Sequence, residues 1–74
     1  MIELPQDADL KPLTWHGARW ADGRRTANMA CSHGHVAGLY DHDIAGDGTV
    51  TPSIVCPVEG CDFHDFVRLV GWLG

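Results

Sequence analysis

The side chains best suited to chemistry in this sequence are three cysteines and the histidines close to them. Cys31 begins the segment Cys-Ser-His-Gly-His, which ends at His35, and Cys56 and Cys61 enclose Pro-Val-Glu-Gly. Thiolates and imidazoles are the ligands of tetrahedral Zn²⁺ sites, which are mostly built from such sets of four. The spacing therefore predicts one Zn²⁺ ion held by Cys31, a neighbouring histidine, Cys56 and Cys61 on two tight turns.

Three histidines compete for the remaining ligand position. His35 gives the spacing Cys-x-x-x-His, His33 gives Cys-x-His, and His64 gives Cys-x-x-His after Cys61. The longer step to His35 lets the residues between form a turn around the Cys31 sulfur, whereas His33 demands a tighter loop. We therefore predict His35 as the ligand, with His33 as its alternate.

The plainest alternative is that the cysteines are small buried residues of the core, where free cysteine is common. A disulfide framework is disfavoured, because the count of three is odd and no export signal is recognisable. Three cysteines in or beside glycine-bearing turns, with histidines nearby, favour a metal site over core packing.

The predicted site is structural rather than catalytic. A catalytic zinc keeps one position open to water beside a general base, whereas here enough good ligands are present to close the shell. Glu59 and Asp62 stand on the second turn and are interpreted as solvated carboxylates. The sequence carries no nucleophile elbow or phosphate-binding loop, so we expect no enzymatic activity.

Hairpin signals surround these turns. Residues 15–20 and 25–30 flank Ala-Asp-Gly-Arg, and an Asp-Gly pair between two such runs favours a β-hairpin. Residues 36–40 and the β-branched run 49–55 are typical of strands, with Pro52 indicating an edge or a bulge. The final segment, 63–73, fits either a helix or a strand, and we favour a strand because Gly71 is poor in a helix.

These elements predict a small all-β domain of four to six strands, with zinc-ribbon-like β-hairpins and two metal-binding turns at one end. Residues 1–12 are expected to form an extended N-terminal arm and residues 13–74 a single zinc-stapled domain. A chain of 74 residues buries a modest core, and domains of this size often need a metal, disulfides or a partner.

Charge and composition narrow the partners. The formal net charge of −5 opposes binding to phosphate backbones, and the basic group Arg19, Arg24 and Arg25 is interpreted as a solvated hairpin turn. No apolar run is long enough to cross a membrane, and no signal peptide is recognisable. We expect a cytoplasmic protein without membrane contact.

Tryptophan is abundant for so short a chain, at positions 15, 20 and 72. Tryptophan is enriched at binding hot spots, yet in a small protein it can equally fill the core. The first hypothesis is a non-enzymatic module that binds another protein. The alternatives are a virion or assembly component that docks on a larger protein, and a zinc ribbon that binds nucleic acid.

Part of the pattern resembles the Rieske motif, in which Cys-x-His is followed by Cys-Pro-x-His-Gly. Cys31 and His33 match the first half, and Cys56 and Gly60 match part of the second, but Glu59 stands where the second histidine is needed. A Rieske [2Fe–2S] centre needs two cysteines and two histidines. We therefore interpret the likeness as superficial and retain an iron–sulfur electron carrier only as an alternative.

A broader likeness covers residues 27–72. Its elements are a cysteine near Gly-His, then Asp-Gly-x-Val-x-Pro-Ser, then Cys-Pro with a second cysteine and Phe-His, then Gly-Trp. In these respects the chain resembles short zinc-ribbon-like proteins from phages of actinobacteria. The resemblance implies a phage-encoded protein made in the bacterial cytoplasm, with a virion as another location. It also implies the ligands Cys31, His35, Cys56 and Cys61, but no activity.

Overall fold

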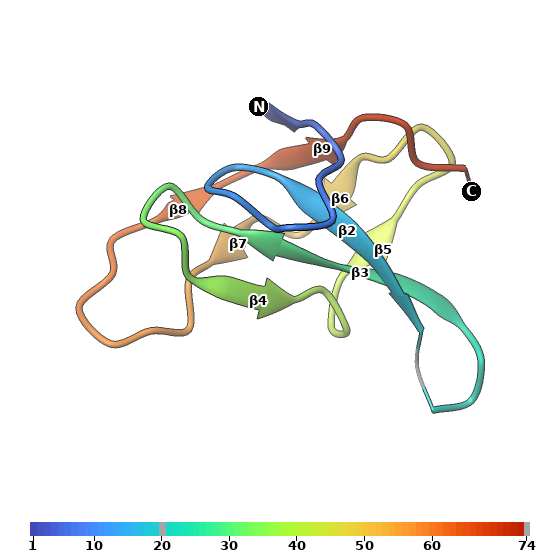
Figure 1. Cartoon of the computed structure of the whole chain (residues 1–74), viewed down its shortest axis with the longest axis horizontal. Coiled ribbons are helices and arrows are strands. Elements are labelled where there is room, and N and C mark those ends of the chain that lie inside the picture. The colour runs from blue at the N-terminus through green and yellow to red at the C-terminus, as the bar shows by residue number, and fades with distance from the viewer. Residues whose placement is uncertain (20, 74) are drawn as a thin grey trace.

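The computed structural model describes residues 1–19 and 21–73, and in this part of the chain every regular element is a β-strand (Figure 1). The all-β prediction is confirmed, but the nine strands found here exceed the four to six expected. No helix in the described residues is long and apolar enough to cross a membrane. The strands are β1 (Ile2–Leu4), β2 (Trp15–Arg19), β3 (Arg25–Ala30), β4 (Val36–Gly38), β5 (Asp43–Ile44), β6 (Val50–Thr51), β7 (Ile54–Val55), β8 (His64–Asp65) and β9 (Val67–Leu69).

The largest sheet is the antiparallel unit β2-β3-β4. Strands β2 and β3 pair in register from Trp15 opposite Met29 to Arg19 opposite Arg25, so the predicted hairpin is confirmed. At its tip, the Arg24 amide donates to the Asp22 carboxylate at 3.0 Å, as expected for an aspartate that opens a turn. Strand β3 continues directly into the Cys31 turn and thereby places the first cysteine at the far end of the hairpin.

The run 49–55 forms two short strands where one was expected. Strand β6 pairs with β5, whereas β7 pairs with β8, and Pro52 lies between β6 and β7. Proline cannot donate to a ladder hydrogen bond, so the strand ends there and the chain changes partner. Strand β7 then leads into Cys56 and delivers the second cysteine pair.

The C-terminal segment is extended, as favoured from the sequence, and it pairs with the N-terminus. Strand β9 lies parallel to β1, with Leu4 opposite Leu69, and both of these leucine side chains are fully buried. The Trp15 amide donates a hydrogen bond to the Pro5 carbonyl, and the Trp15 carbonyl accepts one from the Asp7 amide. Residue 6 thereby forms a parallel β-bridge with Trp15. The two ends of the chain thus stabilise each other. The division into an arm of residues 1–12 and a domain of residues 13–74 stays a prediction.

The core lies between these small sheets and reaches the two cysteine turns. Trp15 is 3% exposed, and its indole N–H donates to the carbonyl of Val70 at 2.9 Å. Cys31 and Cys56 belong to the same buried cluster. Its members are Leu4, Trp15, Ala27, Met29, Cys31, Leu39, Val50, Ile54, Cys56, Phe63, Val67 and Leu69.

Candidate metal centre

The turn after β3 wraps around the Cys31 sulfur. The Gly34 amide donates to the Cys31 carbonyl at 2.9 Å, and the Cys31 amide donates to the His35 carbonyl at 2.9 Å. The His33 amide points at the sulfur, with its nitrogen 3.3 Å from Sγ. Since an N–H directed at sulfur stabilises a thiolate, this turn prepares Cys31 to act as an anionic ligand.

The turn after β7 is also closed by backbone hydrogen bonds. The Cys61 amide donates to the Val58 carbonyl at 3.0 Å, which closes a four-residue turn. Gly60 occupies its third position with φ of +84°, a conformation that favours glycine. The Cys56 amide donates to the Phe63 carbonyl at 3.1 Å, so the chain returns beside its starting point. Cys56 and Cys61 are thereby brought to the same side of the turn.

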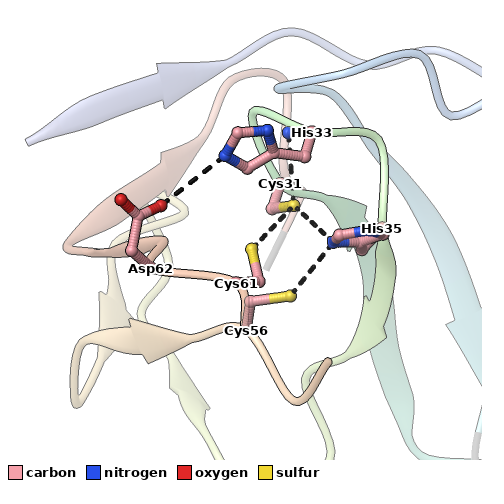
Figure 2. A network of polar contacts seen from close by, with 6 residues as sticks. All are labelled: Cys31, His33, His35, Cys56, Cys61 and Asp62. Atoms are coloured by element: carbon pink, nitrogen blue, oxygen red, sulfur yellow. Dashed lines mark hydrogen bonds and ion pairs between the residues drawn. The ribbon is translucent and has the colours of Figure 1, made fainter. Parts of the chain in front are cut away.

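The two turns lie at one end of the molecule and direct four side chains toward one point (Figures 1 and 2). The Cys31 Sγ lies 3.9 Å from the Cys61 Sγ and 3.5 Å from the His35 Nδ1. The Cys56 Sγ lies 3.7 Å from the same His35 nitrogen. All four donor atoms lie within 4.8 Å of one another, so the cluster can hold a metal ion.

These separations differ from those of a disulfide. A bonded sulfur pair is about 2.05 Å apart, whereas the Cys31 and Cys61 sulfurs are 3.9 Å apart and all three cysteines are free. Ligands about 2.3 Å from a central ion at tetrahedral angles are separated by about 3.8 Å. Three of the donor separations in the cluster, at 3.5, 3.7 and 3.9 Å, lie close to that value. The donor set of three thiols and one imidazole therefore fits a four-coordinate ion by chemistry and by spacing.

The thiols influence one another electrostatically. Burial raises the pKa of Cys31, but backbone hydrogen bonds in its turn and contacts with the thiols of Cys61 and Cys56 lower it below the ordinary value. The backbone N–H of Phe63 lowers the pKa of Cys61, yet burial, the neighbouring thiols and the charge of Cys31 raise it above the ordinary value. Cys31 thus ionises before Cys61, and a cation placed between them would favour both thiolates.

The other histidines lie outside this cluster. His33 is exposed, and its Nε2 lies 3.6 Å from a carboxylate oxygen of Asp62 (Figure 2). His64 is also exposed, and its Nε2 lies 2.8 Å from the Ser53 hydroxyl. His33, Cys61 and Asp62 form a second, more exposed group of possible ligands that shares Cys61 with the first. The contact between His33 and Asp62 was not anticipated, because the two turns meet only in the folded chain.

One side of the cluster opens to the surface. A shallow hollow of about 370 Å³ is lined by His33, His35 and Cys61 together with Val58, Glu59 and Gly60. Such an opening provides the path by which an ion can enter, one of the requirements for a metal site. Glu59 and Asp62 are exposed, as expected for turn carboxylates.

The tryptophans separate into two environments. Trp15 fills the core, whereas Trp72 is half-buried with its ring 5.8 Å from that of Trp15. The Arg25 guanidinium lies over Trp72, 4.7 Å from the ring centre, an arrangement that sequence spacing did not predict. The expectation for the tryptophan at position 20 falls outside the described residues. Arg19, Arg24 and Arg25 lie at the hairpin end, opposite the cysteine turns.

No protein-family profile matches the chain, and neither the curated proteins nor the solved structures contain a significant match.

Proposed function

We propose that Cys31, His35, Cys56 and Cys61 bind one Zn²⁺ ion on two metal-binding turns, as in a zinc ribbon, and that the ion is structural. The observation that carries this proposal is the convergence of three thiols and the His35 Nδ1 within 4.8 Å. Sets of three cysteines and one histidine are typical of structural zinc. Four protein ligands leave no position for a substrate or water, which supports a non-enzymatic role.

Zinc is favoured over an iron–sulfur centre by the composition of the cluster. A Rieske centre needs two imidazoles, whereas only His35 contributes one to the group of four. His33, which the Rieske pattern requires, has its side chain beside Asp62. Tetrahedral sets of thiolate and imidazole are typical of zinc.

The zinc-stapled domain is in this proposal an interaction module for another protein of a phage or of its bacterial host. Support comes from exposed apolar side chains, including Val36 at 52%, Phe66 at 50% and Leu73 at 78% exposure. Because single exposed apolar side chains are common on protein surfaces, they support a binding role only where they adjoin a shaped site. The phage origin and the bacterial cytoplasm follow from the sequence resemblance alone.

Elemental analysis of purified protein, combined with an absorbance spectrum, tests the metal assignment. The expected result is one zinc per chain and a colourless solution. Replacement by Co²⁺ should give the intense visible bands of a tetrahedral thiolate site, and Cys56→Ser should abolish them. Ser53→Ala is the matched control, because it lies near the second turn but offers no ligand to the cluster. A red-brown protein that contains iron and labile sulfide would contradict the proposal.

A further inference from the structure

The outer edge of strand β2 is paired with residues 5–7 at Trp15 but is open from Gly17 onward, next to a basic hollow. The Trp15 amide donates to Pro5 and its carbonyl accepts from Asp7, so the backbone groups of Trp15 point away from β3. Ala27 is the residue of β3 opposite Gly17, and its carbonyl accepts the Leu39 amide. The Ala27 carbonyl therefore points away from β2, so Gly17 and Ala27 do not hydrogen-bond each other. Since backbone direction alternates along a strand, the N–H and C=O of Gly17 also point outward. No described residue forms a hydrogen bond with these two groups of Gly17.

A hollow opens over this edge because position 17 has no side chain. Trp15, Gly17 and Arg19 occupy alternate positions and therefore face the same side of β2. A Cβ atom added to Gly17 would meet nothing within 4 Å. The resulting space of about 310 Å³, here called the Gly17 hollow, is lined by Gln6, Trp15, Gly17, Ala18, Arg19, Arg25, Thr26, Gly71, Trp72 and Leu73.

The walls of the Gly17 hollow combine aromatic surface with positive charge. Trp15 and Trp72 provide the aromatic part, and Arg25 is held over the Trp72 ring while it donates to the Leu73 carbonyl. Arg19 is exposed and uses one of its five N–H groups on the Gly23 carbonyl. Among the described residues, the lining contains two arginines and no carboxylate side chain, although the whole chain carries a net charge of −5.

We propose that this edge binds a short, extended, acidic peptide segment of a partner protein. The segment adds as a strand to β2, beside Gly17, and places one apolar side chain in the Gly17 hollow and a carboxylate against Arg19. Strand addition satisfies the free backbone groups, and the hollow supplies side-chain specificity. Charge complementarity favours an acidic occupant, because the arginines are a local exception on an acidic surface.

This inference names the class of partner for the proposed interaction module and therefore rests on that function. The metal assignment and the peptide-binding inference can fail separately. A protein with one zinc per chain that ignores the peptide would overturn the inference and leave the metal assignment intact. A protein that binds the peptide but lacks zinc would overturn the metal assignment and leave the inference intact.

The test is a titration of zinc-loaded, isotope-labelled protein with a synthetic peptide of alternating glutamate and leucine, followed by NMR. We expect shifts of the Gly17 and Arg19 amides and of the Trp72 indole. Replacing glutamate by glutamine in the peptide should weaken binding several-fold. Methylation of alternate backbone nitrogens should abolish it, because a methylated amide cannot pair with a strand edge.

Two substitutions with matched controls sharpen the test. Gly17→Leu fills the hollow and should weaken binding at least about tenfold, whereas Gly46→Leu, also with open space at its Cβ, should not. Arg19→Gln should weaken binding about two- to fivefold. Arg24→Gln removes the same charge from a residue that pairs with Asp22 outside the hollow, and should have less effect.

Three results would overturn the proposal. The first is no binding at millimolar peptide, and the second is binding that Gly17→Leu leaves unchanged. The third is a single-stranded oligonucleotide that shifts the same signals more strongly than the acidic peptide does, since the aromatic and cationic walls would then serve base stacking.

Discussion

At the scale of single residues, His33 and His35 are two positions apart in one turn but have different surroundings. Two tight turns with candidate metal ligands were recognisable from Cys31, Cys56 and Cys61, and the structure places His35 beside these cysteines. Spacing favoured His35 over His33 but could not settle the choice, because it depends on which way each ring points. In the folded chain His33 contributes its backbone N–H to the Cys31 sulfur and turns its ring toward Asp62.

This arrangement predicts different outcomes for three histidine variants. His35→Ala removes the imidazole that lies 3.5 Å from the Cys31 sulfur, so it should lose zinc and unfold. His33→Ala keeps the backbone N–H that contacts the sulfur and should cost less than about 1 kcal/mol, since only an exposed ion pair is lost. His64→Ala should be similarly mild, because its partner is a hydroxyl at the surface.

The measurements are zinc stoichiometry and the thermal midpoint of each variant. His16→Ala serves as a further control, because His16 is an exposed residue of β2 outside the cluster. If His33→Ala were the variant that loses zinc, the fourth ligand would be His33, and the likeness to the Rieske turn would gain weight.

At the scale of elements, the local sequence predicted the strands correctly where a turn determines their pairing. The hairpin of β2 and β3 was predictable, because Asp-Gly and the flanking strands agree. The division of 49–55 into β6 and β7 was not, since it depends on separate partners, β5 and β8, that are not evident from the local sequence. Parallel pairing of β1 with β9 joins the two ends of the chain, and short-range patterns carry no information about such contacts.

Gly48 shows how strongly one element can depend on another. Its carbonyl accepts the Leu69 amide at 2.8 Å, its φ is +92°, and an added Cβ would lie 2.2 Å from the Leu69 carbonyl oxygen. Gly48→Ala should therefore force β9 away from the turn and destabilise the protein by roughly 2–4 kcal/mol. Gly46→Ala, in the same turn but with open space, should change stability by less than about 1 kcal/mol.

Chemical denaturation of the zinc-loaded proteins measures this difference. Equal stability of the Gly48→Ala and Gly46→Ala variants would mean that Leu69 can retreat from the turn without loss. The approach of β9 to Gly48 would then contribute little to the fold.

At the scale of the whole molecule, the fold consists of small sheets around a limited core. Within residues 1–19 and 21–73, the longest strand has six residues, and three of the four sheets are two-stranded pairs. Isolated two-stranded units are marginally stable in water, so each depends on the others. The two cysteine turns belong to different units, since one joins β3 to β4 and the other joins β7 to β8. An ion held between the turns would therefore join the large hairpin to the β7–β8 pair.

Metal removal should consequently unfold the whole chain rather than loosen one end. The unfolded chain has no preformed site, so the binding energy of a structural zinc is folding energy, about 10–16 kcal/mol in small zinc domains. That amount matches or exceeds the roughly 5–15 kcal/mol of net stability typical of a small protein. Treatment with EDTA, or the substitution Cys56→Ser, should abolish amide dispersion even in β2 and at Leu4, which lie outside the cysteine turns.

Zinc added back should restore the spectrum of the EDTA-treated protein, whereas Mg²⁺ should not, because Mg²⁺ prefers oxygen ligands. Dispersed signals and an unchanged melting midpoint after chelation would show that the core holds the sheets together without the metal.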